Sequence, residues 1–145
     1  MALKKATRGS QYPLVAEFTF EIGDTMVNTA GAADAFATVA AHVFDVINLP
    51  VNAVVINGGV VTETAFTGST AYNITVGDSA VANLYLDTTN RVAAGRTAII
   101  PTGYVGLGEN IRMTATPTGA AATAGKLTVR IEYVTRDKMH ETQTH

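Results

Sequence analysis

The sequence has no cysteine and no tryptophan, and charged residues make up only 15% of its 145 residues. The absence of cysteine excludes disulfide bonds, thiolate zinc sites and thiol catalysis together. No apolar run reaches the roughly 18 residues of a membrane-spanning helix, so we expect no membrane partner. The N-terminal stretch MALKKATRGS has basic residues but no apolar segment behind them, which is not the pattern of a secretory signal.

Basic residues are missing from a long central part of the chain. Residues 9–90 contain eight acidic side chains and no lysine or arginine, whereas Lys4, Lys5 and Arg8 precede them. The net charge is −2 and no basic patch is interleaved with aromatic residues, so we expect no nucleic-acid partner. The basic N-terminus is either an ordinary solvated end, which the shortness of the run favours, or a tether to an acidic neighbour.

The composition favours β-strands over helices. The chain contains 16 valines and 22 threonines, which are stiff at χ1 and suit a pleated sheet, and 13 glycines, which suit turns. Apolar and polar residues alternate in four segments, which predicts half-buried strands. These segments are Ala16–Ile22, Tyr72–Val76, Ile111–Ala115 and Leu127–Tyr133.

Two further segments are ambiguous. Residues Ala53–Phe66 contain two adjacent glycines and form either a hairpin or one long strand bent at the glycines; the lack of another turn before Gly68 favours the bent strand. Apolar residues over 33–47 fit both a helix and a strand. We predict a loop over Gly31–Ala37 and a strand from about Thr38 that stops at Pro50.

Turn-forming residues separate these segments. Asp87–Asn90 has the composition of a turn, and the small-residue loop Pro117–Gly125 is predicted to join two neighbouring antiparallel strands. Seven or eight strands punctuated in this way predict an all-β fold, a jelly-roll-like antiparallel β-sandwich. We expect a flexible N-terminal arm over residues 1–12, the sandwich over 13–135, and a flexible C-terminal tail over 136–145.

One motif suggests a hydrolase. A Gly-Asp-Ser turn at Gly77–Ser79 and a distant Asp137-Lys138-Met139-His140 resemble the triad segments of one esterase class. That class is a larger α/β fold, and no apolar residue after Val134 would hold His140 near the serine. We therefore predict no catalytic residue and no enzyme, and keep a small serine esterase as a remote alternative. The motif is expected to end a strand, with Gly77 making the turn and Asp78 or Ser79 bonding backbone N–H groups.

No metal or cofactor site is predicted. His42 stands alone, and His140 and His145 lack the spacing of zinc ligands. No alternating aspartates form a calcium loop, although a calcium ion at the sandwich edge stays a minor alternative. Tyr85 and Tyr104 could stack on a sugar, but in a chain without tryptophan we favour core or rim roles for both.

Three segments together resemble one protein family. They read VINLPVNAVVINGGVVTETAF, YNITVGDSAVANLYL and AAATAGKLTVRIEYV. Over roughly residues 14–135 the chain resembles the decoration, or cement, proteins on the capsids of tailed bacteriophages. The resemblance implies a jelly-roll sandwich without enzymatic activity, which forms a homodimer or homotrimer on the outer surface of the virion. It also implies that the protein clamps neighbouring copies of the major capsid protein.

The basic arm is the candidate partner-binding segment. We expect Lys4, Lys5, Arg8 and Tyr12 to contact the capsid or a neighbouring copy and to become ordered there. A second interpretation keeps the sandwich and the phage origin but makes the chain a receptor- or glycan-binding module of a tail or fibre. Binding to host cells or glycans instead of capsids would separate the two.

Overall fold

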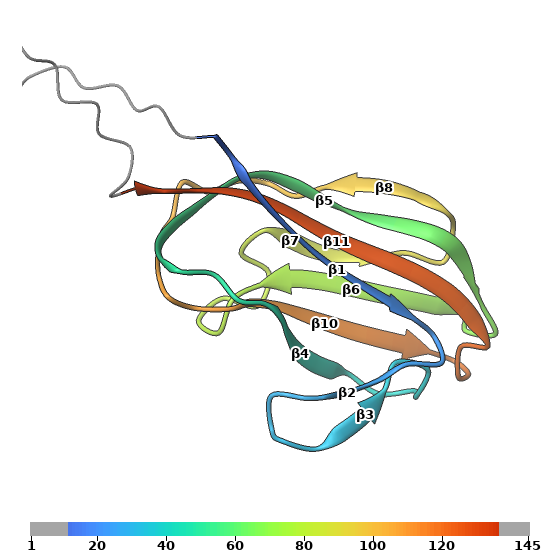
Figure 1. Cartoon of the computed structure of the whole chain (residues 1–145). Coiled ribbons are helices and arrows are strands. Elements are labelled where there is room, and N and C mark those ends of the chain that lie inside the picture. The colour runs from blue at the N-terminus through green and yellow to red at the C-terminus, as the bar shows by residue number, and fades with distance from the viewer. Residues whose placement is uncertain (1–11, 137–145) are drawn as a thin grey trace, which may run out of the picture.

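The computed structural model describes residues 12–136 of the chain, and these fold into two facing antiparallel sheets (Figure 1). The larger sheet has the strand order β1-β11-β5-β8, with β9 beside β5. Its strands are β1 (Leu14–Glu21), β5 (Val51–Thr67), β8 (Gly95–Ala98), β9 (Val105–Leu107) and β11 (Ala124–Thr135).

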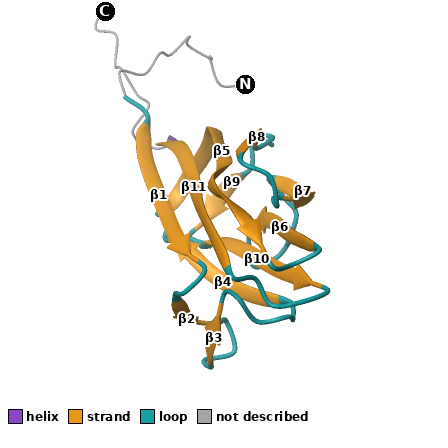
Figure 2. Cartoon of the chain, turned by 90° about the vertical axis from the view of Figure 1, so that its right-hand side faces the viewer, coloured by secondary structure: helices purple, strands orange, loops and turns teal. Residues whose placement is uncertain are grey.

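The smaller sheet has the order β4-β10-β6-β7, and a separate two-stranded hairpin lies beside it (Figure 2). The smaller sheet contains β4 (His42–Ile47), β6 (Ala71–Gly77), β7 (Leu86–Asn90) and β10 (Ile111–Thr118), and the hairpin contains β2 (Thr25–Val27) and β3 (Ala33–Ala35). The predicted all-β, jelly-roll-like antiparallel sandwich is confirmed. Over residues 12–136 no helix is long and apolar enough to cross a membrane.

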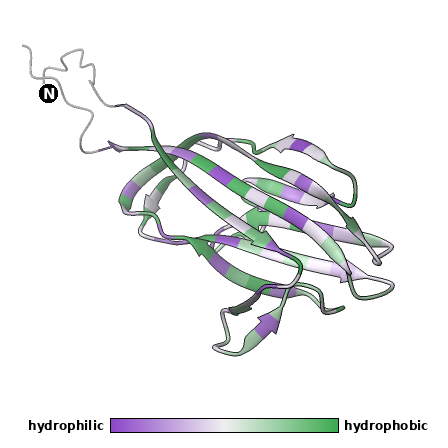
Figure 3. Ribbon diagram, turned by 45° about the vertical axis from the view of Figure 1, so that its right-hand side comes forward, coloured by the Kyte–Doolittle hydropathy of each residue, from purple (hydrophilic) through white to green (hydrophobic). Residues whose placement is uncertain are grey.

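The core lies between the two sheets and follows the predicted alternation. Figure 3 shows apolar and polar residues alternating along the strands. The side chains of Tyr72, Ile74 and Val76 on β6 are fully buried, as expected. The rings of Tyr72 and Phe66 stack with centroids 4.0 Å apart, and the Tyr72 hydroxyl donates a 2.9 Å hydrogen bond to the Phe36 carbonyl. Burial raises the pKa of Tyr72, and the hydrogen bond satisfies its polar end inside the core.

Strand β5 is one long bent strand, as predicted, and not a hairpin. It pairs with β11 along most of its length, and the pairing register shifts next to the glycine pair. Gly58 has a φ of 149°, and a Cβ there would lie 2.3 Å from the Arg130 carbonyl oxygen. The close approach of β11 therefore requires glycine at this bend.

Two local predictions were wrong. The predicted loop Gly31–Ala37 contains strand β3, and the strand predicted from Thr38 begins only at His42. The predicted turn Asp87–Asn90 is strand β7. Both missed strands are short and polar and lie at the margin of the fold, so pairing with a neighbouring strand defines them and no apolar alternation marks them in the sequence.

The loop Pro117–Gly125 was also predicted wrongly. Its first two residues belong to β10 and its last two to β11, and these strands lie in different sheets. The chain therefore crosses here from one layer of the sandwich to the other. Both strands turn apolar side chains, such as Met113 and Leu127, into the same core from opposite sides.

The sandwich has two distinct ends (Figure 1). We call the end where β1 begins and β11 finishes the arm end, because the chain enters and leaves the sandwich there. The opposite end, beside β2 and β3, is called the hairpin end. The predicted arm and tail lie outside the described residues, apart from Tyr12 and Arg136, and their flexibility stays a prediction.

Candidate interface surface

The Gly-Asp-Ser motif closes β6 at the arm end. The Asp78 side chain is buried, and its Oδ1 accepts hydrogen bonds from the backbone amides of Ala80 and Val81 at 2.8 and 2.7 Å. A Cβ on Gly77 would lie 2.1 Å from the Val81 carbonyl oxygen. Asp78 thus stabilises the turn, as predicted. Gly77 does not make the turn, because it belongs to the strand. A glycine is needed there because the backbone of Val81 and Ala82 lies close to it.

The serine of the motif has no histidine beside it among residues 12–136. Ser79 is exposed at the arm end, whereas His42 begins β4 at the hairpin end. The His42 ring lies with Nδ1 2.9 Å from Asp34 Oδ2 and Nε2 3.1 Å from the Thr38 carbonyl oxygen. The other triad candidate, His140, lies outside the described residues. The described geometry therefore does not assemble a triad around Ser79.

No cluster of metal-ligating side chains occurs within residues 12–136. The pair formed by His42 and Asp34 joins β4 to the hairpin and has no third ligand near it. A stable metal site needs more donors than this pair supplies.

The two tyrosines considered for sugar stacking have structural roles. Tyr85 is 5% exposed and belongs to the core, where burial raises its pKa to about 12. The Tyr104 hydroxyl donates a 2.9 Å hydrogen bond to Glu109, and this bond raises the pKa of Tyr104. The Glu109 carboxylate also accepts the amide of Leu107. Tyr104 and Glu109 therefore stabilise the loop between β9 and β10.

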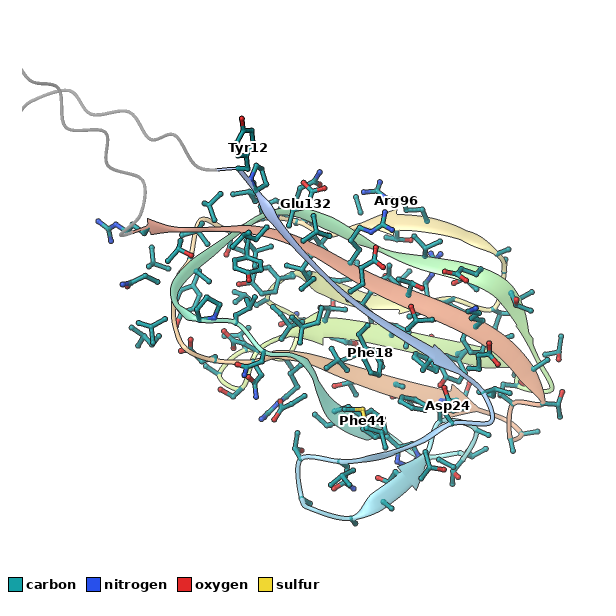
Figure 4. The ribbon with its side chains drawn as sticks, viewed as in Figure 1. Tyr12, Phe18, Asp24, Phe44, Arg96 and Glu132 are labelled. Carbon is teal, nitrogen blue, oxygen red and sulfur yellow. The ribbon has the colours of Figure 1, made fainter. Side chains whose placement is uncertain are left out.

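The outer face of the larger sheet is polar and largely self-paired. The Arg130 guanidinium pairs with Glu17, and Lys126 Nζ lies 3.6 Å from the carboxylates of both Glu21 and Glu63. Beside them, a hollow of about 250 Å³ lies over the glycine pair of β5. Figure 4 shows Arg96 and Glu132, two of its lining residues, on this face. The hollow carries charges of both signs, so it favours neither an anion nor a cation.

Exposed apolar side chains gather at the arm end. Among residues 12–136, ten large apolar side chains are exposed, and eight of them lie there. Leu107 is 76% exposed and faces Val51 across the β9–β5 pair. This concentration makes the arm end the best candidate for an interface in the described part of the chain. The eight residues, which we call the arm-end patch, are Tyr12, Leu14, Val15, Val51, Ile56, Val81, Ile100 and Leu107.

Of the predicted partner-binding residues, only Tyr12 is described. It is 89% exposed, and Figure 4 shows its side chain pointing away from the sandwich. Lys4, Lys5 and Arg8 lie outside the described residues. The rest of the arm-end patch was missed in the sequence. A usable signal was present where two apolar residues are adjacent, as in Leu14-Val15, because only one of the two can face the core.

Comparison with known proteins finds likeness in fold and none in sequence. No family model and no curated protein matches the chain. A chain in the capsid asymmetric unit of cyanophage Pam1 is similar with a TM-score of 0.61 and 17% identity, over 93% of this chain and 91% of that one. A chain in the "acidic stable" capsid structure of Helicobacter pylori bacteriophage KHP30 is similar with a TM-score of 0.61 and 15% identity, over 88% and 90% respectively. At these identities the likeness shows a shared fold, which occurs in the capsid structures of two phages.

Proposed function

We propose that this chain is a structural protein of a phage virion, which decorates the outer surface of the head and clamps neighbouring copies of the major capsid protein. The observation that carries the proposal is that the fold comparison covers nearly all of this chain and nearly all of each similar chain. About nine-tenths of this chain superimposes on about nine-tenths of each chain from the two phage capsid structures. The likeness therefore extends over a whole unit of the same size.

The shape and surface of the sandwich suit a clamp. A shell under internal pressure is strengthened by any protein that buries surface across the joints between its subunits. Many weak contacts repeated over a symmetric shell add as avidity, so each copy needs only a modest interface. The arm-end patch supplies apolar area, and the basic residues of the N-terminal arm precede it directly in the chain. A clamp of this kind needs no catalytic residue, and we propose a non-enzymatic role.

Self-assembly belongs to the same proposal. We propose that copies associate as a homodimer or homotrimer on the shell. The N-terminal arm, with Lys4, Lys5 and Arg8, would reach an acidic neighbour, either the shell or another copy, and become ordered on it.

The proposal is tested by co-sedimentation of the purified protein with undecorated phage heads, followed by imaging of the shell. We expect saturable binding at regular lattice positions. Deletion of residues 2–10 should weaken binding and flatten its dependence on salt, because three basic side chains are lost. Binding to host cells or glycans without binding to heads would contradict the proposal and favour a tail or fibre module. Ester hydrolysis that disappears in both Ser79→Ala and His140→Ala would favour the hydrolase.

A further inference from the structure

Strand β1 has an open edge. Within the described residues it pairs only with β11, through eight successive residue pairs without a register shift. The amide of Ile22 donates to the Gly125 carbonyl. Because hydrogen-bonding residues alternate along an antiparallel strand, the even-numbered residues of β1 direct their N–H and C=O groups toward β11. The odd-numbered residues Val15, Glu17 and Thr19 therefore direct their N–H and C=O groups to the open side.

The other sheet edges are less suited to accept a strand. The edge strand β4 has a neighbour, because the Thr29 amide donates to the Val43 carbonyl. β8 has only four residues, and the register of β7 shifts against β6. In the described part of the chain, β1 is the longest regular open edge. Such an edge is a template for pairing with another chain.

A cleft of mixed polarity opens beside this edge, between β1 and the hairpin, and Thr19, Asp24 and Thr25 are its polar lining residues. It has a volume of about 210 Å³, and its apolar walls are Phe18, Phe20, Met26 and Phe36. Phe18 and Met26 are only half-buried, so apolar surface is left accessible there. Asp24 lines the cleft with an exposed side chain, and Figure 4 shows Phe18 and Asp24 near the lower end of β1.

An open edge next to a cleft that leaves part of Phe18 and Met26 accessible has the geometry of peptide recognition by strand addition. In that mode the backbone hydrogen bonds of the edge provide affinity, and a pocket beside the edge selects an alternate side chain of the added strand. We propose that the β1 edge binds the N-terminal arm, residues 1–11, of a second copy of this chain as an added strand.

Charge complementarity supports this occupant. The arm contains Lys4, Lys5 and Arg8 and no acidic residue, whereas residues 12–90 contain no lysine or arginine. Four acidic side chains lie on β1, the hairpin and the turn between them. Glu17, Glu21 and Asp34 already have partners, so the charge left for the arm is that of Asp24, which makes no ion pair with a described residue. The arm is also long enough, because eleven extended residues span up to about 36 Å. Leu3 is the arm's large branched apolar residue and suits the cleft.

The local backbone favours a second copy over the chain's own arm. Tyr12 precedes Pro13, and a residue before proline is held in an extended conformation. An arm that returned onto its own β1 would have to reverse direction next to this rigid point. Exchange of arms between copies avoids that reversal and would link them. The inference rests on the self-assembly in the proposed function and does not depend on binding to a phage head.

Disulfide trapping in the full-length chain tests the exchange, because the chain has no native cysteine. One variant carries Lys4→Cys in the arm, because with Leu3 in the cleft the side chain of residue 4 lies on the outer face, and a second carries Thr19→Cys on the same face of the β1 edge. The matched control is Thr75→Cys on β6. The hydroxyls of Thr19 and Thr75 each hydrogen-bond to a threonine on the next strand, at 2.8 and 3.1 Å. Only Thr19 lies on the proposed edge.

Mixtures of the Lys4→Cys chain with each partner are oxidised mildly, and the mixed dimers are quantified. We expect several-fold more dimer with Thr19→Cys than with Thr75→Cys, because strand pairing brings the thiols within bonding distance. A synthetic peptide of residues 1–11 should compete and lower the yield. Equal yields with both partners would overturn the proposal. A double variant, Lys4→Cys with Thr19→Cys, that closes only within one chain would overturn it too, because the chain's own arm would then occupy the edge.

Discussion

At the scale of single residues, two aspartates fix the ends of the sandwich. Asp78 holds the turn after β6 at the arm end through two backbone amides. Asp34 joins the hairpin to β4 at the other end, where its Oδ2 accepts a 2.6 Å hydrogen bond from Asn28 and lies 2.9 Å from His42. Each carboxylate satisfies groups that would otherwise lack partners. The Gly-Asp-Ser motif therefore has a structural explanation in its aspartate.

The first prediction separates Asp78 from the serine next to it. Asp78→Ala leaves the amides of Ala80 and Val81 without their acceptor, and we expect a loss of about 1–3 kcal/mol in the free energy of unfolding. Ser79→Ala is the control and should change it by less than about 0.5 kcal/mol, since this side chain is exposed. Urea unfolding followed by circular dichroism measures both. If the two substitutions lowered the free energy of unfolding equally, Asp78 would not be the residue that stabilises the turn.

The second prediction concerns acid. The hydrogen bonds from Asn28 and then His42 hold the pKa of Asp34 below its usual 3.8. The unfolded chain therefore takes up this proton at a higher pH than the folded chain. The stability contributed by Asp34 is present above the usual pKa and is lost as the pH falls through the lower, folded pKa. We expect the urea midpoint of Asp34→Asn to depend less steeply on pH between about pH 5 and pH 2.5 than that of the native chain. Identical slopes would rule out this contribution.

At the scale of elements, β5 organises the larger sheet. This single strand of 17 residues pairs with β11 on one side and with β8 and β9 on the other. Its bend at the glycine pair lets β11 follow it closely. A side chain at Gly58 would meet the backbone of β11, so the pairing of the two longest strands depends on a residue without Cβ.

The third prediction tests this bend. Gly58→Ala combines an unfavourable φ with a Cβ that lies 2.3 Å from the Arg130 carbonyl oxygen. We expect destabilisation by about 2–5 kcal/mol. Gly23→Ala is the control, because a Cβ there meets no atom within 4 Å and its φ is not in the left-handed region. Thermal or urea unfolding should show a large effect for the first variant only, and similar midpoints would refute the argument.

At the scale of the whole molecule, polarity differs between the surfaces. The outer face of the larger sheet carries paired charges, which contribute little to binding. The arm end carries eight of the ten exposed large apolar side chains of residues 12–136, and the chain enters and leaves the sandwich at this end. A partner that contacts this end would meet apolar surface next to the points where the chain enters and leaves the sandwich.

The fourth prediction tests whether the apolar arm end is the surface that contacts a partner. The double variant Val51→Ser and Leu107→Ser should weaken binding to phage heads by about 1–2 kcal/mol for each side chain that the partner buries. The control changes Val27 and Val39 to serine at the hairpin end, where exposure is comparable. All four residues are exposed, so unfolding should change little in either variant. Equal loss of binding in both would show that the arm end is not the contact surface.

Much of the sandwich could be predicted from local patterns. The alternation in Leu127–Tyr133 and Tyr72–Val76 predicted the buried face correctly, since a slip of one residue would turn apolar side chains to water. Asp78 was predicted as one of two candidates for closing the turn after β6. The arm-end patch was not predicted, because its eight residues come from β1, β5, β9 and the loops around them. Only the fold brings them to one end.

The sequence by itself determined that the segments with alternating apolar and polar residues are extended, and which of their faces are buried. The physical reason is that side chains alternate within a strand, so this information is local. The tertiary structure alone decided which strands pair. It showed that polar Asp87–Asn90 is a strand, that Pro117–Gly125 crosses between the sheets, and that β1 has an open edge. Pairing is set by hydrogen bonds and packing between residues far apart in the chain, so the local pattern does not contain it.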